Sequence, residues 1–211
     1  MSESPSSAPR RAGRPVDSDS VATRDAIIDC ARKCFAVEGF DGATVGAIGG
    51  AAGLSKAAMY HYFDRKADLY LAVCGEVAAR LESMLAAALA SGDTVEVRLR
   101  TLFTAIAHAG QDQPSMIGFV AGVGTVVRRH PELMSDVDSL LLSKVRSDLG
   151  AMIDSSSDRH AVLGDITTPA FVDLVVVVIT GLGRLGLTRP SDRYLAAGSA
   201  FLSLLTGVRP A

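Results

Sequence analysis

The sequence of 211 residues predicts an all-α protein, and three observations support this fold class. Apolar residues recur along most of the chain at the i, i+3, i+4 and i+7 spacing of an amphipathic helix. Glycine, proline and serine interrupt this spacing at intervals that are typical of helix ends. Hydrophobic residues make up 48% of the sequence, which is enough for a sizeable core and too much for a disordered chain.

Residues 1–20 are set apart from this helical pattern. They are rich in Ser, Pro, Ala, Arg and Asp and have almost nothing to bury, so we expect a flexible arm. The arm carries Arg10, Arg11 and Arg14 in the string RRAGRP. A basic arm of this kind contacts phosphates or enters the minor groove of DNA, although a plain disordered tail fits the composition equally well.

Composition limits the class of protein. The net charge is only −2, so any binding of nucleic acid must come from a local basic surface. The N-terminus has no apolar stretch of the signal-peptide kind, and the most apolar run, residues 174–182, is too short for a bilayer, which needs about 20 residues. The three cysteines lack the spacing of a disulfide framework. We therefore expect a cytoplasmic protein with reduced thiols and no membrane segment.

Three short helices are predicted within residues 21–67, which we expect to form one small domain. The first runs from Val21 to Glu38, where Gly39 ends it. Thr44 is placed to cap a second helix and Ser55 to cap a third, which is expected to end in residues 60–63. With the tight turn at residues 52–55, this arrangement predicts a helix-turn-helix over residues 44–63.

The helix-turn-helix segment contains no acidic residue, and the nearest carboxylates, Asp41 and Asp64, lie at its edges. It carries a lysine, a histidine and two tyrosines. The second helix of such a motif enters the major groove of DNA. Lys56 can donate to guanine, whereas Ala57 and Ala58 permit close approach and contact with a thymine methyl group. The segment therefore predicts a DNA-binding surface.

The residues that follow are expected to join this surface to the rest of the protein. Met59 and Phe63 are four residues apart and should share a face that points into the core. Asp64 is expected to cap a fourth helix, with Asp68 favourable near its positive end. Lys66 lies in the first turn of that helix, where its charge and the free amides can bind one phosphate.

Residues 68–211 are expected to form a larger helical C-terminal domain. Beyond a long helix over residues 65–89, the pattern predicts helices at 95–108, 114–129, 135–153, 169–187 and 191–206, and a polar loop at 155–165. The β-branched run from Val175 to Thr180 favours a strand by propensity. No second strand is visible to pair with it, so we predict a helix that is buried on most sides.

The segment from Arg24 to Tyr70 resembles the N-terminal DNA-binding domain of the tetracycline-repressor (TetR) family of transcriptional regulators. The residues that carry the resemblance are Ile27, Ile28, Ala31, Phe35, Gly39, Phe40, Thr44, Val45, Ile48, Ala52–Lys56, Tyr60–Phe63, Lys66 and Leu69. The resemblance implies an all-helical homodimer that binds an operator palindrome, with repression as the family's usual mode. It also implies a small-molecule pocket in the C-terminal domain and a dimer interface formed by helices 169–187 and 191–206.

The resemblance also implies roles for individual residues. Base contacts would come from Lys56, Ala57, Ala58, His61 and Tyr62, and phosphate contacts from Thr44, Tyr60 and Lys66. Ser55 completes this candidate DNA-binding set as the cap of the reading helix.

The second helix departs from the family pattern because it contains three glycines. Gly46 stands where relatives often place a basic or polar reader, and Gly49 and Gly50 follow the isoleucine. Each glycine in a helix costs about 1 kcal/mol relative to alanine, so this helix should be frail and should contribute little to base reading. On this reasoning Gly49→Ala is expected to stabilise the domain.

The candidate ligand pocket rests on helical periodicity and on the family analogy. Its expected lining residues are Phe103, Met116, Phe119, Val120, Val123, Leu141, Val145 and Phe171. Few charges fall on these faces, so an apolar or weakly polar ligand is favoured over a sugar or a nucleotide. His108 and His130 are expected to be helix-end residues.

Other classes of function are less well supported. The sequence has no common catalytic motif, and the glycines of residues 181–186, spaced as GxGxxG, do not open a helix after a strand, so we expect no enzyme and no cofactor. Cys30 and Cys34 lie four residues apart, a spacing that suits a redox sensor, but no further ligand supports a metal site. A regulator controlled by a protein partner or by thiol redox state, without a small-molecule ligand, remains the alternative.

Overall fold

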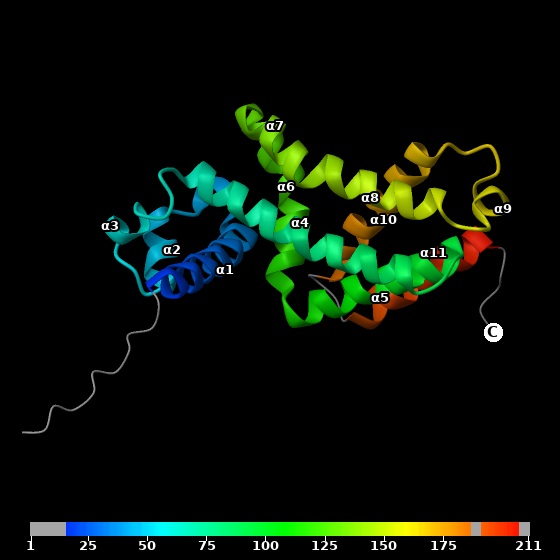
Figure 1. Ribbon diagram of the computed structural model, residues 1–211, viewed down its shortest axis with the longest axis horizontal. Helices are drawn as coiled ribbons and strands as arrows, with labels where there is room; N and C mark the ends of the chain where they lie inside the picture. The colour runs from blue at the N-terminus through cyan, green and yellow to red at the C-terminus, as the bar shows by residue number, and fades with distance from the viewer. Residues whose placement is uncertain (1–15, 187–190, 207–211) are drawn as a thin grey trace, which may run out of the picture.

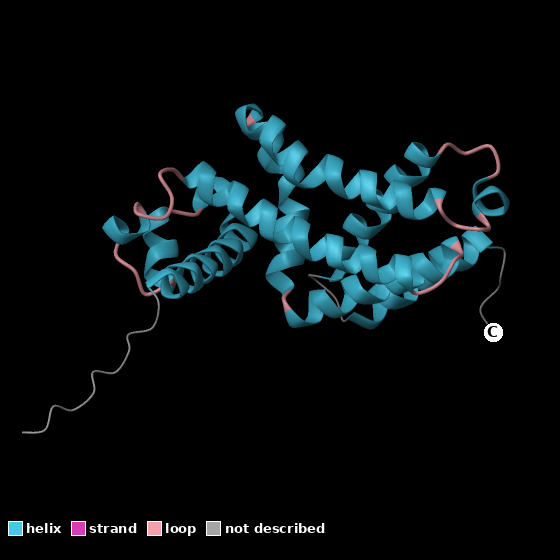
Figure 2. Cartoon of the chain, in the orientation of Figure 1, coloured by secondary structure: helices cyan, strands magenta, loops and turns pink. Residues whose placement is uncertain are grey.

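The computed structural model describes residues 16–186 and 191–206. Every regular element in these ranges is helical, and no strand occurs there (Figures 1 and 2). The molecule is elongated, with the three N-terminal helices at one end and the C-terminal helices at the other (Figure 1). None of the helices in the described part of the chain is long and apolar enough to cross a membrane. The basic arm with Arg10, Arg11 and Arg14 lies outside the described residues.

The predicted helix-turn-helix is present. Helix α1 spans Val16–Gly42, and its helical path is broken at Gly39, which has a φ of 69°. Helices α2 (Val45–Ala51) and α3 (Lys56–Met59) follow, joined by a turn in which Gly53 also has a positive φ. Helix α1 begins five residues earlier than expected, because no glycine or proline separates Val16 from Val21 and a helix continues until a breaker stops it.

Helix α4 (Lys66–Ala90) connects the two ends of the molecule (Figure 1). At 1.5 Å per residue it is about 37 Å long. The expectation that Asp64 caps this helix is wrong. Arg65 occupies the cap position, and the carboxylate of Asp68 accepts a hydrogen bond from its backbone N–H at 3.1 Å. The carboxylate of Asp68, in the first turn of the helix, therefore takes the place of a capping side chain at the position before the helix.

The C-terminal domain contains the helices that the spacing predicts, with small differences. In order they are α5 (Val95–Asp112), α6 (Pro114–Arg129), the 3₁₀ turn η1 (Pro131–Leu133), α7 (Met134–Val137), the π-helical stretch η2 (Asp138–Leu142), α8 (Ser143–Asp154), α9 (Arg159–Leu163), α10 (Thr168–Gly186) and α11 (Ser191–Thr206). The polar loop expected at residues 155–165 contains the short helix α9, because one turn of helix can bury Leu163.

The β-branched run of α10 is helical, as predicted, but it is not buried on most sides. Val175 is buried, whereas Val177 is 65% exposed in the single chain. Helix α10 packs on α5, α6, α8 and α11, and both Leu174 and Val177 on this helix are exposed.

Two hydrophobic cores hold the fold together. The first includes residues of α1 to α4 and continues into α6 through Met116, Phe119 and Val123. The second joins the end of α4 to α5, α8, α10 and α11. The N-terminal domain therefore shares its core with α6. Arg32 of α1, which is only 1% exposed, strengthens this junction through ion pairs with Asp29 and Glu76 and a hydrogen bond to Ser115.

Candidate nucleic-acid interface and ligand cavity

Both predicted N-caps of the helix-turn-helix are formed. The hydroxyl of Thr44 accepts a hydrogen bond from the N–H of Ala47 at 3.1 Å, and the hydroxyl of Ser55 accepts one from Ala58 at the same distance. Thr44 and Ser55 are themselves exposed. These caps fix where α2 and α3 begin, and therefore which residues stand at the exposed ends of the two helices.

The structure brings the candidate base-reading residues together on α3 and the turns after it. Lys56, Ala57 and His61 are exposed, and Ala58 and Tyr62 are half-buried. The reading helix is shorter than expected, because α3 ends at Met59 and residues 60–62 form turns held by backbone hydrogen bonds to Ala58 and Met59. Tyr60 is 46% exposed. Contact with DNA by any of these residues stays a prediction.

The two residues expected in the small core are there. Met59 is fully buried and Phe63 is 6% exposed. Met59 packs directly against Gly49 of α2. A Cβ atom on Gly49 would lie 2.8 Å from the Cγ atom of Met59 and 3.1 Å from the carbonyl oxygen of Leu54. Gly49 therefore permits the close approach of α2 and α3, and the expectation that alanine is preferred here is reversed.

Lys66 is used within the protein, which the sequence did not predict. Its Nζ atom donates to the carbonyl oxygens of Ala43 at 3.1 Å and Asp41 at 3.4 Å, and it lies 4.6 Å from the centre of the Phe40 ring. An ammonium group has three donors. Two of them hold the backbone before Thr44.

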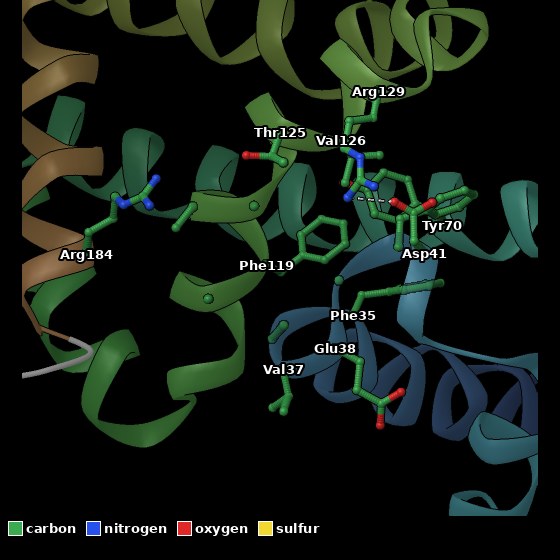
Figure 3. Close-up of a pocket in the computed structure, with 16 residues that line it drawn as sticks. Phe35, Val37, Glu38, Asp41, Tyr70, Phe119, Thr125, Val126, Arg129 and Arg184 are labelled. Carbon is green, nitrogen blue, oxygen red and sulfur yellow. Dashed lines mark ion pairs between the residues drawn. The ribbon is translucent and has the colours of Figure 1, made fainter.

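Asp41 connects this loop to the end of α6. One of its carboxylate oxygens lies 3.0 Å from Arg129 Nη1, and the other lies 2.6 Å from His130 Nε2 (Figure 3, which draws the Asp41–Arg129 pair). Sequence reasoning identified His130 correctly as a helix-end residue, since it is the C-cap of α6. It missed the partner, because Asp41 and His130 are 89 positions apart.

The hydrogen bond with Asp41 shifts the pKa values of both groups. It raises the pKa of His130 above its ordinary 6.5, with a further contribution from Glu132. The same hydrogen bond, together with the charge of Arg129, lowers the pKa of Asp41 below 3.8. The charged forms of both side chains are therefore favoured in this contact.

A groove of about 520 Å³ lies beside this contact, between the end of α1 and α6, and Arg184 of α10 also lines it (Figure 3). Its wall includes Phe35, Phe119 and Tyr70, whose hydroxyl is buried without a hydrogen-bond partner among the described residues. Phe119 was expected to line a ligand pocket, but it belongs to the core between α1 and α6.

A second cavity, of about 290 Å³, lies inside the C-terminal domain. Four of the eight predicted residues line it, namely Val120, Val123, Leu141 and Val145. The residues that the sequence did not identify are Leu81, Leu85, Leu102, Ile106, Gly124, Leu142, Arg146, Leu149, Val176, Ile179 and Thr180.

The other four predicted residues are buried but do not line this cavity. Phe103 packs near the rings of Tyr194 and Phe201, and Met116, Phe119 and Phe171 fill the two cores. Helical periodicity identifies the inward face of a helix, but it does not tell whether the space that the face meets is filled.

The cavity is almost wholly apolar. Its polar side chains are Thr180, whose hydroxyl donates to the carbonyl oxygen of Val176 in its own helix, and Arg146, which pairs with Asp173 at 3.1 Å. The interior therefore offers few hydrogen-bonding groups to a ligand, and Arg146 supplies one cationic group.

Cys34 and Cys74 do not have the features of a reactive thiol. Burial raises the pKa of Cys74 to about 12, and partial burial raises the pKa of Cys34 as well. A reactive thiol needs a lowered pKa, so these positions favour the unreactive thiol form. No cluster of three or more potential metal ligands occurs among the described residues.

The sequence of the N-terminal domain matches known proteins. Residues 27–73 match the family model described as bacterial regulatory proteins, tetR family. The HTH-type transcriptional repressor AcnR of Corynebacterium glutamicum is 41% identical over 63 residues, which cover 30% of this chain and 34% of AcnR. The HTH-type transcriptional repressor Rv1474c of Mycobacterium tuberculosis is 40% identical over a segment of the same length. The chain thus spans about a third of the length of these curated relatives.

The fold is shared over most of the chain. The fatty acid degradation regulator FadR of Bacillus halodurans has a TM-score of 0.72 at 18% identity, covering 95% of this chain and 100% of that structure. FadR of Bacillus subtilis, solved in complex with stearoyl-CoA, has a TM-score of 0.69 at 15% identity, covering 88% and 99%. Residues 27–73 thus resemble the tetR family of bacterial regulatory proteins in sequence, and the chain shares its overall fold with these solved structures.

Proposed function

We propose that the protein is a cytoplasmic transcriptional repressor that binds a palindromic operator as a homodimer. The observation that carries this proposal is the surface of α2 and α3, which is exposed, capped at both helix starts and free of acidic residues from Thr44 to Phe63. DNA carries a dense row of phosphates, and a surface without carboxylates lets a helix approach it closely.

The residues of this surface divide into two roles. Lys56, Ala57, Ala58, His61 and Tyr62 are the proposed base-contacting residues. Thr44, Tyr60 and Lys66 are the proposed phosphate contacts, and Arg10, Arg11 and Arg14 of the arm would add further ones. Base contacts specify the sequence, whereas phosphate contacts fix the position of the protein on it.

The exposed apolar surface of α10 and α11 supports dimerisation. Leu174 is 42% exposed, Val177 is 65% exposed and Leu204 is 84% exposed in the single chain. Clusters of exposed apolar side chains on a soluble domain mark interaction surfaces. A two-fold dimer through these helices would cover this surface and would present two α3 helices to the two half-sites of a palindrome.

We further propose that the C-terminal cavity binds a small apolar ligand that releases the operator. A volume of about 290 Å³ is at the lower end of ligand sites, and the lining excludes strongly polar ligands. The relative bound to stearoyl-CoA shares the fold, but a ligand of that size would require the cavity of this protein to open further. A short fatty-acid chain fits the volume and the apolar lining better.

The DNA-binding proposal is tested by selecting a binding site from random duplexes and titrating it at several salt concentrations. Affinity should fall with salt, with a slope of about −0.9 for each phosphate that the protein neutralises. Lys56→Ala should relax the preference at one base position by about 1–3 kcal/mol. Lys66→Ala should weaken binding to all sequences similarly.

Lys33→Ala is a matched control, because Lys33 is an exposed lysine of α1 that pairs with Asp29 outside the helix-turn-helix. It should leave the sequence preference unchanged. Absence of salt-dependent binding to every duplex would exclude the repressor function. Equal changes of preference in Lys56→Ala and Lys66→Ala would show that the two roles are assigned incorrectly.

A further inference from the structure

The contact of Asp41 with Arg129 and His130, which we call the interdomain clasp, joins the N-terminal domain to α6. It links the segment before α2 to the last turn of α6. Phe40, the neighbour of Asp41, also packs its ring edge-on against His130, with the ring centres 4.7 Å apart. The end of α6 therefore holds this segment by an ion pair, a hydrogen bond and a ring contact.

The segment held by the clasp leads directly into the helix-turn-helix. Asp41 precedes the N-cap Thr44 by three residues. Lys66 donates hydrogen bonds to the carbonyl oxygens of Asp41 and Ala43. On the N-terminal side of the segment, the helical path of α1 is interrupted at Gly39. The positive φ of Gly39 separates the segment from the long part of α1. The segment is thus anchored to α6, to the start of α4 and, through the stacked rings of Phe35 and Phe40, to α1.

We propose that Asp41 is a positioning residue for DNA recognition, which fixes the start of α2 to the end of α6 through Arg129 and His130. This inference rests on the proposed function, because it concerns how the DNA-binding surface is held. Helix α6 also lines the C-terminal cavity at Val120, Val123 and Gly124. Val123 is six residues from Arg129, or about 9 Å along the helix. The same helix therefore carries both cavity-lining residues and the partners of Asp41.

The clasp has a defined dependence on pH. The titratable and charged groups that face it are Asp41, His130, Arg129, Glu132 and Lys66. The pKa of His130 is raised, so its contribution is complete below 6.5 and is lost as the pH rises through the raised value. The pKa of Asp41 is lowered, so its contribution is complete above 3.8 and is lost only in stronger acid. The charged clasp is therefore strongest between 3.8 and 6.5 and weakens as the pH rises through the raised pKa of His130.

Hydrogen exchange of the intact protein tests this proposal without DNA. Backbone protection of residues 40–52 is measured at about pH 6 and about pH 8 and corrected for the intrinsic pH dependence of exchange. In the wild type, protection should fall at the higher pH by about two- to fivefold, the range of an exposed ion pair. Asp41→Asn should lower protection at both pH values and remove the difference between them.

Two further variants separate positioning from general destabilisation. His130→Arg keeps a cation at every pH, so it should retain protection of residues 40–52 but lose the pH dependence. Glu96→Gln removes an exposed ion pair with Arg100 in α5, far from the clasp, and should behave as the wild type. Equal pH dependence in the wild type and Asp41→Asn would overturn the proposal.

The same variants are then titrated with the selected operator. Asp41→Asn should bind more weakly than the wild type, and its affinity should no longer follow the pH dependence that the wild type shows as His130 loses its proton. Unchanged operator affinity and pH dependence in Asp41→Asn would refute the positioning role even if repression is correct. If the wild type binds no DNA while the exchange results hold, the proposed function fails, but the mechanical link between α6 and α2 stands.

Discussion

At Gly49 the absence of a side chain is a packing requirement. Gly49→Ala places a methyl group against Met59 and the Leu54 carbonyl, and the backbone oxygen cannot move without shifting the turn. We expect this variant to lower the free energy of unfolding by roughly 1–3 kcal/mol, the usual cost of overpacking. Denaturant unfolding followed by circular dichroism measures the change.

Gly50→Ala is the matched control in the same helix, because a Cβ atom at Gly50 meets no other atom within 4 Å. It should leave stability unchanged or raise it by up to about 1 kcal/mol through helix propensity. If Gly49→Ala were as stable as Gly50→Ala, the contact between Gly49 and Met59 would not be tight. Propensity describes a residue alone, so the sequence could not reveal that the next helix fills the space beside Gly49.

Other single residues show the same division between local and distant causes. The caps at Thr44 and Ser55 were predictable because each side chain binds an amide three residues away. The partners of Lys66 and His130 were not predictable, because they are brought close only when α1, α4 and α6 pack together. The candidate DNA-binding residues could thus be identified from the sequence, but the groups that hold them in place could not.

At the scale of elements, α10 shows how tertiary context decides secondary structure. Its valine-rich run has a high strand propensity, but the absence of a second strand correctly predicted a helix. The burial of α10 was predicted incorrectly, because the other helices of a single chain cover only part of its surface. The apolar residues that remain exposed are those a partner subunit would cover.

We expect Val177→Glu to convert the proposed dimer into a monomer. The substitution places a charge on the exposed face of α10, and burying it in an interface without a partner is costly. Sedimentation velocity of the wild type and the variant measures the change. Val21→Glu is the matched control, since Val21 is 60% exposed near the start of α1, in the N-terminal domain. A Val177→Glu protein that remained dimeric while folded would place the interface elsewhere.

At the scale of the whole molecule, the sequence predicted the fold better than the cavity. Helix order follows from spacing and breakers, which act along the chain. The cavity depends on how α4, α5, α6, α8 and α10 meet, and it includes Leu81 of α4 and Leu102 of α5, neither of which was predicted. The four lining residues that were predicted correctly, Val120, Val123, Leu141 and Val145, lie between α6 and α8. The inward faces of these helices border the cavity.

Filling the cavity tests whether the interior binds ligands. Decanoate should raise the melting temperature of the wild type in a concentration-dependent way, because a ligand that binds the folded state stabilises it by RT ln(1 + [L]/Kd). Val145→Phe adds bulk to the cavity wall and should abolish most of this increase. Val97→Phe makes the same change at an exposed position of α5 outside the cavity, so its response should equal that of the wild type. If both variants responded equally, decanoate would be binding at another surface, and the groove beside the interdomain clasp would be the next site to block.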